Sequence, residues 1–500
     1  MNRQCKSALT LRGILFILVA SVCFSLIFFE CNSPLGPSIG SDNAMYLTMG
    51  TAIARGYAPY SDIFDHKGPL LFILETIPQA LSGGYSTLAV FIQEWLFLFA
   101  CLIILHRICA DAGCKTPWLV LLTYLALNAP LVSGGNLSEL YTNLFTLAGL
   151  FLILRVFDRD GLPGARSLFL HAGGIGVMVM LCFMTRANNM LVLCCAVLGL
   201  TLALAIQRRP GAIGVCAGGF LLGSLAAAAP ILLWLRHYGA LGDAFYGAII
   251  HNMMYAETDG IGRVTKLLHS SYGHLAMFIA AVACAGALLH GLHTRRFCVS
   301  LALIAGAAGA GIGAFISHKY YDHYLMLGTP TAAVGAALIL STLSSSAKAR
   351  RTLAAITAAA CCATLCVFGS QAYARRSADF SAMEQFTADA QALYAQVPED
   401  ERGSFMAYRV EPKWYVATGA LPCMRFYFLQ EILADADPRV MDEIVDTFET
   451  DPPQWLVIYY NRAFSPPYDP RVAEIFETRY AFVDAQGEYQ LLRLIREDRP

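Results

Sequence analysis

Long apolar runs recur from residue 13 to residue 369, and they restrict the fold more than any other feature of the sequence. A helix needs about 20 mostly apolar residues to cross the ~30 Å core of a bilayer. Charged residues make up only 14% of the chain, against about 25% in a typical soluble protein. We therefore predict an integral membrane protein whose membrane part is all-α. With short extensions into their flanks, about eleven runs qualify as spans: 13–29, 88–105, 117–131, 140–156, 168–184, 190–206, 213–235, 274–289, 297–316, 324–343 and 353–369.

Basic residues alternate between the two sides of these runs. Arg3, Lys6 and Arg12 precede the first run, which resembles an uncleaved signal anchor and places the N-terminus in the cytoplasm. The apolar segment 69–83 covers only ~22 Å as a helix, so we predict a re-entrant or interfacial helix there. If that segment is not counted as a span, all later basic clusters fall in cytoplasmic loops. We therefore predict a multi-pass protein of the cell membrane whose C-terminal region is extracytoplasmic. These clusters are Arg107 and Lys115; Arg155, Arg159 and Arg166; Arg208 and Arg209; Arg295 and Arg296; Lys348, Arg350 and Arg351.

The composition changes after residue 369, where charged residues and prolines become frequent. Residues 435–448 have helical periodicity, 452–462 are typical of a buried strand, and 479–495 of a hairpin. We predict two domains: a membrane domain over 1–369, with a first extracytoplasmic loop at 30–86, and a small extracytoplasmic α/β domain over 370–500. The net charge of −1 gives no indication of a nucleic-acid partner.

With this orientation, four charged segments converge on the outer face. They are the first loop, 133–143, 185–189 and 317–324. Ionisable side chains at span ends are functional candidates because their burial is costly. Carboxylates there can act as general bases towards a hydroxyl, while Lys, Arg and His can hold a phosphate. With interfacial tyrosines suited to an isoprenoid tail, the set suggests sugar transfer from a lipid phosphate.

Each candidate also has a structural interpretation that requires no function. Ser41 or Asp42 could N-cap a helix over 43–55, and Asn136 to Glu139 matches a capping box. Asp62 and Asp65 could be turn residues, and Arg186 could extend to the interface. His318, Lys319 and His323, with the neighbouring tyrosines, could form an interfacial fringe.

The first loop resembles the first extracytoplasmic loop of bacterial GT-C glycosyltransferases. The relatives are glycosyltransferase family 39, with its protein O-mannosyltransferases, and the lipid A aminoarabinose transferases. The span pattern and the C-terminal domain are also similar to that family. The matching residues are Asp42, Tyr46, Gly56, Pro59, Tyr60, Asp62, Phe64, Asp65, His66, Lys67, Pro69 and Leu70.

The resemblance implies a GT-C fold and an inverting transfer from a polyprenyl-phosphate sugar to an acceptor hydroxyl on the outer face. It implies Asp42 and Glu139 as catalytic residues, with Asp42 as the base, and Lys67 and Arg186 as the main donor-phosphate contacts. The sequence departs from many relatives at Asn43, where they have a second acid. Further donor-binding candidates are Tyr46, Tyr60, Asp62, Asp65, His66, His318, Lys319, His323 and Tyr324.

No metal ligand is assigned, although a divalent metal stays open, as do the sugar and whether the acceptor is a lipid, a glycan or a protein. A transporter or flippase for a lipid-linked or cell-envelope substrate is the alternative, but that class favours internal repeats and charges near the bilayer midplane. We find neither in the sequence. A scaffold that keeps the fold without needing Asp42 or Lys67 is a third hypothesis.

Overall fold

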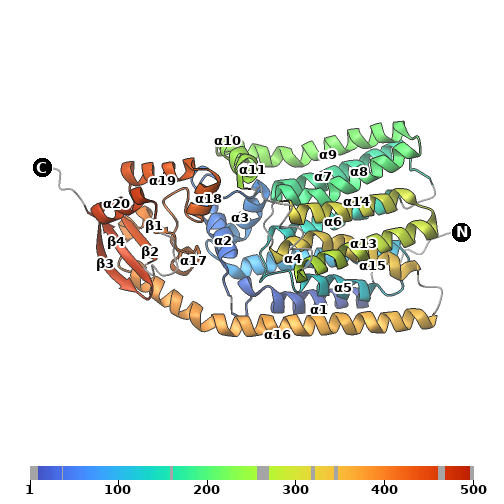
Figure 1. The fold of residues 1–500 in the computed structure, drawn as a ribbon, viewed down its shortest axis with the longest axis horizontal. Coiled ribbons are helices and arrows are strands. Elements are labelled where there is room, and N and C mark those ends of the chain that lie inside the picture. The colour runs from blue at the N-terminus through green and yellow to red at the C-terminus, as the bar shows by residue number, and fades with distance from the viewer. Residues whose placement is uncertain are drawn as a thin grey trace. The chain divides into compact units, whose positions relative to one another are not determined.

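The computed structural model describes residues 10–36, 38–157, 161–255, 270–316, 321–342, 347–459 and 468–495 (Figure 1). The chain divides into two compact units. We call Met1–Ser33, Phe91–Leu233 and Ala256–Ala374 the helical unit. We call Pro34–Val90, Trp234–Tyr255 and Arg375–Pro500 the mixed unit.

The long apolar helices confirm the prediction of a multi-pass, all-α membrane part. In the described part of the chain, 10 helical segments are long and apolar enough to cross a membrane. Those of the helical unit run side by side in Figure 1. The segments are Leu11–Phe28 (α1), Thr87–Asp111 (α4), Ser138–Phe157 (α6), Ala165–Thr185 (α7), Ala187–Ile206 (η2 and α8), Pro210–His237 (α9), Ser271–Thr294 (α13), Phe297–Phe315 (α14), Asp322–Thr342 (η4 and α15), and Arg351–Tyr394 within α16 (Ala347–Tyr394).

The predicted span at 117–131 is shorter than expected. Helix α5, Pro117–Asn128, has only 12 residues, so a full-length helical span is wrong at this position. The helix ends just before Pro130, which has no backbone N–H to continue it. The loop that follows contains four successive residues, Ser133 to Asn136, with positive φ angles of 45°, 89°, 96° and 50°. The loop after α5 lies against α4, because the backbone N–H of Asn136 donates a hydrogen bond to Glu94, near the start of that helix.

Close helix contacts in the helical unit depend on small residues. A Cβ atom on Gly286 of α13 would collide with the backbone of Gly335 of α15. One on Gly223 of α9 would collide with the backbone of Gly173 of α7. Small side chains at such crossings let the backbones approach, which is how membrane helices gain van der Waals contact.

Helix α3, Pro69–Ser82, has 14 residues, and its length agrees with the prediction of a helix too short to cross. Gly68 is its N-cap, Pro69 occupies its first turn, and Gly83 ends it at φ +76°. Gly83 is suited to this left-handed position because it has no Cβ. The side of the membrane on which each loop lies stays a prediction.

The mixed unit contains the predicted α/β region. Its four-stranded sheet has the order β1-β2-β4-β3, with β1 parallel to β2 and the other pairs antiparallel. The strand predicted at 452–462 is β2, and the hairpin predicted at 479–495 is β3 and β4. The strands are Phe405–Tyr408 (β1), Trp455–Tyr459 (β2), Tyr480–Gln486 (β3) and Tyr489–Leu494 (β4).

Besides the C-terminal part of α16, the mixed unit contains several short helices. The helix predicted at 435–448 is α19, which begins at Arg439 and ends at Thr450. The other helices are Ser41–Ala54 (α2), Leu241–Phe245 (α10), Tyr246–His251 (η3), Asn252–Tyr255 (α11), Glu399–Ser404 (η6), Lys413–Thr418 (α17), Gln430–Ala436 (α18) and Pro470–Arg479 (α20).

The first loop and the C-terminal segment share this unit through direct hydrogen bonds. The hydroxyl of Tyr427 donates to the backbone oxygen of Met45 at 3.0 Å. The N–H of Phe64 donates to the backbone oxygen of Arg425, also at 3.0 Å. The structure therefore groups residues 34–90 with the chain that follows residue 374.

Candidate functional site

Three of the four predicted charged segments come together in the helical unit around Glu139. This residue lies in the first turn of α6 and is only 1% exposed. Its Oε1 accepts a hydrogen bond from Nη1 of Arg186 at 2.7 Å, and its Oε2 accepts one from Oγ of Ser138 at 2.9 Å. Nη2 of Arg186 donates to the hydroxyl of Tyr324 at 2.6 Å. The start of α6, the residue after α7 and the 3₁₀ helix η4 thus supply one connected group.

These contacts contradict the interpretation of Glu139 as part of a capping box. In a capping box, the Glu139 carboxylate would accept from the backbone N–H of Asn136. That N–H donates to Glu94 instead, while both Glu139 oxygens are used by Ser138 and Arg186. The guanidinium of Arg186 lies 4.4 Å from the centre of the Tyr324 ring and pairs with Glu139, so this side chain has partners of its own within the group.

His323 joins this group through ring contacts. Its ring lies edge-on to Tyr324 with a centroid distance of 4.8 Å and stacks on Tyr321 at 5.6 Å. Two other candidates from the same segment, His318 and Lys319, lie outside the described residues.

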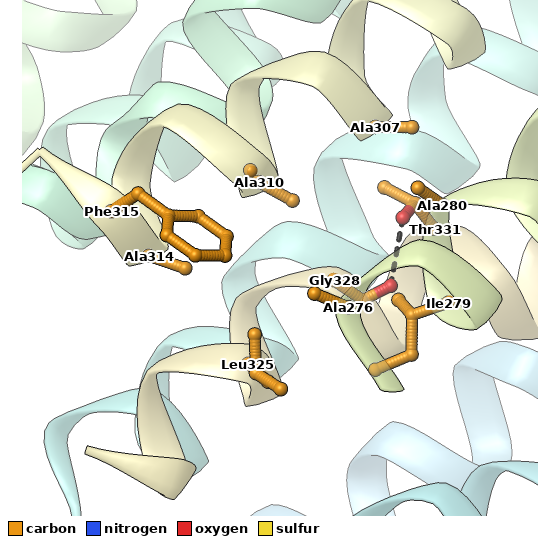
Figure 2. A pocket seen from close by; sticks show the side chains of 11 residues that line it. Ala276, Ile279, Ala280, Ala307, Ala310, Ala314, Phe315, Leu325, Gly328 and Thr331 are labelled. Carbon is orange, nitrogen blue, oxygen red and sulfur yellow. Dashed lines mark hydrogen bonds between the residues drawn. The ribbon is translucent and has the colours of Figure 1, made fainter. Parts of the chain in front are cut away.

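An apolar pocket begins next to Tyr324, between α13, α14, η4 and α15. Figure 2 shows small alanine side chains around it, with Phe315 and Leu325. The hydroxyl of Thr331 donates to the backbone oxygen of Gly328 at 2.7 Å, so this polar group is satisfied within its own turn. The surface offered by this pocket is therefore suited to hydrocarbon. Its lining comprises Ala276, Ile279, Ala280, Ala307, Ala310, Gly311, Ala314, Phe315, Leu325, Gly328 and Thr331.

The first loop forms a second, separate group inside the mixed unit. Asp65, His66 and Lys67 are consecutive and are 2%, 6% and 9% exposed. Nδ1 of His66 lies 2.9 Å from Oδ1 of Asp65, and Nζ of Lys67 lies 3.8 Å from Oδ2 of Asp65. Nζ of Lys67 also lies 3.3 Å from Nε2 of His66. Because an ammonium group only donates, Nε2 of His66 is the acceptor in this contact.

The charges in this group determine the state of its carboxyl. Burial alone raises the pKa of Asp65, but Lys67 and His66 outweigh that effect and hold the pKa of this carboxyl well below its usual value. Asp65 is therefore an anion at neutral pH. It compensates the positive charge of Lys67, which would otherwise be buried alone.

Two tyrosines complete the surroundings of Lys67. The fully buried Tyr60 donates its hydroxyl to the backbone oxygen of Lys67 at 2.7 Å. Burial raises the pKa of Tyr60 well above its usual value, so this hydroxyl keeps its proton. The ring of Tyr46, on α2, has its centre 6.0 Å from Nζ of Lys67.

Residues far along the chain hold this loop in place, and sequence analysis missed them. Nε of Arg425 donates to the backbone oxygen of Tyr60 at 2.8 Å. Oδ2 of Asp243 accepts from the hydroxyl of Ser61 at 2.7 Å, and Nδ2 of Asn252 donates to the backbone oxygen of His66. No motif marks these three residues. The only local signal is an arginine among the aromatic residues of the segment 422–428.

The remaining two candidates of the first loop differ from each other. Asp62 closes a turn, because its Oδ2 accepts from the N–H of Ala58 at 2.7 Å. Asp42 is exposed in the first turn of α2, whose N-cap is Gly40 with no side-chain hydrogen bond. The prediction that Ser41 or Asp42 caps this helix is therefore wrong. Across the residues that the structure describes, no hydrogen bond or ion pair engages the Asp42 carboxylate.

A buried carboxylate in α4 was also missed. Glu94 is 0% exposed and accepts hydrogen bonds from Nδ2 of Asn32, at 2.9 Å, and from the backbone of Asn136. Its position inside the predicted span 88–105 is the signal that could have identified it, since ionisable residues are rare in spans.

Clusters with metal-binding geometry do not occur among the described residues, which include no group of three or more His, Cys, Asp or Glu able to hold an ion. The Asp65 group offers one carboxylate and one imidazole, and the adjacent ammonium of Lys67 repels a cation. A divalent metal stays a possibility that the sequence leaves open.

Comparisons with known proteins place the fold. No protein-family model matches the chain, and no curated protein matches it in sequence. The crystal structure of ArnT from Cupriavidus metallidurans in the apo state matches with a TM-score of 0.60 and 12% identity, over 96% of this chain and 97% of that chain. The crystal structure of the Archaeoglobus fulgidus oligosaccharyltransferase tethered with an acceptor peptide matches with a TM-score of 0.48 and 11% identity, over 91% of this chain and 70% of that chain. The near-complete coverage of ArnT confirms that this chain has an ArnT-like GT-C membrane fold.

Proposed function

We propose that the protein is an integral-membrane inverting glycosyltransferase. It moves a sugar from a polyprenyl-phosphate donor to an acceptor hydroxyl on the extracytoplasmic face. The shared fold with ArnT supports the general kind of activity. The observation that carries the proposal is the state of Asp42, an exposed carboxylate in the first turn of a helix that is otherwise almost entirely buried.

Asp42 has the properties of a general base. Its carboxylate is exposed in the first turn of α2, where an acceptor hydroxyl can come within hydrogen-bond distance of it. In the proposed step, Asp42 takes the proton of the acceptor hydroxyl while the acceptor oxygen bonds to the anomeric carbon. The bond from that carbon to the phosphate oxygen breaks, its electron pair leaves with the lipid phosphate, and the anomeric configuration inverts.

Arg186 and Lys67 are the proposed contacts of the donor phosphate. Positive charge and donated hydrogen bonds stabilise the negative charge that grows on a leaving phosphate. Arg186 is 16% exposed, and its guanidinium lies beside the Tyr324 hydroxyl, so both groups can donate to a phosphate oxygen. Lys67 is paired with Asp65, and contact with a phosphate requires it to exchange that carboxylate for the ligand.

The apolar pocket next to Tyr324 suits the lipid part of such a donor (Figure 2). The pocket is lined mainly by alanine and glycine residues, and the one hydroxyl among them, of Thr331, is already hydrogen-bonded, so an isoprenoid unit gains contact there without losing a hydrogen bond. The sugar and the acceptor are not specified by these residues.

The test is an Asp42→Asn variant of the full chain in nanodiscs, assayed with a panel of polyprenyl-phosphate hexoses and pentoses. Asparagine keeps the shape of aspartate but cannot take the proton, so we expect transfer to fall by at least about 100-fold, the lower range for loss of general-base catalysis. Asp400→Asn is the matched control, because Asp400 is an exposed carboxylate in η6. Retained transfer in the Asp42→Asn variant would remove this residue from the mechanism.

A further inference from the structure

Glu94 is a carboxylate buried inside the apolar helix α4, and its partners are two loops. Oε2 accepts from the side-chain amide of Asn32, just after α1, at 2.9 Å. Oε1 accepts from the backbone N–H of Asn136, in the loop that leads into α6. A buried carboxylate is costly unless its oxygens are hydrogen-bonded, so these two contacts tie the position of both loops to α4.

The contact between Glu94 and the loop backbone requires glycine in the loop. A Cβ atom on Gly135, which has φ +96°, would lie 2.6 Å from Oε1 of Glu94 and 3.2 Å from Cβ of Phe29. The backbone oxygen of Gly134 accepts from the N–H of Cys31 at 2.9 Å. The Gly-Gly pair therefore lets the backbone approach the carboxylate, which any side chain would prevent.

Hydrogen bonds connect this loop to the start of α6. Oδ1 of Asn136 accepts from the hydroxyl of Tyr141 at 2.9 Å, and that hydroxyl also accepts from Nε2 of Gln93 at 3.3 Å. Asn136 and Tyr141 lie on either side of Glu139 along the chain. The network fixes the first turn of α6 from both sides, and this turn carries the carboxylate that pairs with Arg186.

We infer that Glu94 is a positioning residue, which holds the 133–137 loop so that Glu139 meets Arg186 and Tyr324 in one geometry. Its catalytic consequence rests on the proposed glycosyl transfer, whereas its effect on the loop does not. Glu94 accepts from the backbone of Asn136, and Asn136 accepts from Tyr141 in α6, so the influence of Glu94 passes through Asn136 and the loop backbone.

The experiment compares three variants of the full chain in nanodiscs. Glu94→Ala removes both acceptors, and Glu94→Gln keeps one carbonyl acceptor and the shape. Leu98→Ala is the matched control, because Leu98 lies one turn further along α4 and is also buried, but has no polar group. Amide hydrogen exchange of the 131–137 peptide reports the loop, and kinetics with polyprenyl-phosphate sugars report the site.

We expect Glu94→Ala to raise exchange in this peptide by about tenfold or more, as expected for loss of a charge-assisted hydrogen bond. Turnover should fall between about 10-fold and 100-fold, because a displacement of the order of 1 Å has this effect on a reacting geometry. The donor KM should change by less than about twofold, since Glu94 contacts no donor in this proposal. Glu94→Gln should lie between Glu94→Ala and wild type in both measurements.

Unchanged exchange of the 131–137 peptide would overturn the inference, and so would an equal loss of turnover in Leu98→Ala. If Glu94→Ala does not fold, Glu94→Gln decides the matter by the same two readouts. A folded wild-type protein that transfers none of the sugars would overturn the proposed function. The exchange result would then decide by itself whether Glu94 positions the loop.

Discussion

Two groups of charged side chains in this protein are built in different ways. Glu139, Arg186 and Tyr324 are separated along the chain by 47 and then 138 residues, and only the packing of helix ends brings them together. Asp65, His66 and Lys67 are neighbours in sequence, and one buried loop holds all three. The first group has one acid and one permanently charged base. The second has one acid facing two basic side chains.

This difference determines what each group depends on. The Glu139 group should respond to any change that moves α6, α7 or η4, because each supplies one member. The Asp65 group should survive such changes and respond instead to residues that hold its loop, such as Arg425. The proposed phosphate contacts therefore differ as well. Arg186 is held in place by Glu139 and Tyr324, whereas Lys67 must leave Asp65 before it can bind a ligand.

The largest expected effect on stability comes from Arg186→Ala. This change leaves the buried Glu139 without its compensating charge, and breaking a buried ion pair from one side typically costs about 3–5 kcal/mol. Removing both partners, with Glu139→Ala added, should restore a large part of that loss. Unfolding of the single and double variants in detergent gives the coupling energy through a double-mutant cycle. Additive effects of the two substitutions would show that the pair is not energetically coupled.

The Asp65 group was easier to predict from the sequence than the Glu139 group, because its members are consecutive whereas those of the Glu139 group come from distant helix ends. Consecutive residues form a motif that is visible in the sequence, and Asp65, His66 and Lys67 do lie together. Pairing of Glu139 with Arg186 requires the crossing of α6 and α7, which periodicity and charge alone do not determine. The sequence could place both residues at span ends, but not within 2.7 Å of each other.

Helix ends were the main source of error in the fold prediction. The run 117–131 is mostly apolar, yet α5 ends at Asn128, just before Pro130, and the loop behind it turns through residues of positive φ to reach Glu94. That turn depends on a tertiary partner in α4. Arg425 and Asp243 were missed for a related reason, since their partners in the loop, the backbone oxygen of Tyr60 and the hydroxyl of Ser61, are far away in sequence.

A pH titration tests the Asp65 group next. The folded pKa of Asp65 lies below the unfolded value of 3.8, so its ionisation stabilises the fold above that pH and the gain is lost as the pH falls further. Asp65→Asn removes this dependence. We expect wild type to exceed Asp65→Asn in stability by a constant amount between pH 8 and about pH 5, and the difference to shrink below about pH 4. Thermal unfolding of both proteins across this range measures it, with Asp442→Asn on the exposed side of α19 as control. A difference that grows on acidification would contradict the assigned charge.

The smallest effect is expected from Arg425→Ala, and it is local. Arg425 donates to Tyr60 in the loop and to Asp243 and Glu443 elsewhere in the mixed unit, at distances of 2.8 to 3.2 Å. Loss of a hydrogen bond to a charged group costs about 1.5–3 kcal/mol, and water can replace part of it because the side chain is 20% exposed. We expect amide exchange of residues 59–67 to rise by about tenfold, while the 131–137 peptide stays protected. Arg439→Ala is the matched control, since Arg439 is 73% exposed and pairs with Asp437 rather than with the loop. Equal exchange in the two variants would mean that the loop holds the Asp65 group without Arg425. The contrast with the Glu139 group would then be sharper. A local turn would suffice for the Asp65 group, whereas the Glu139 group needs three helix ends.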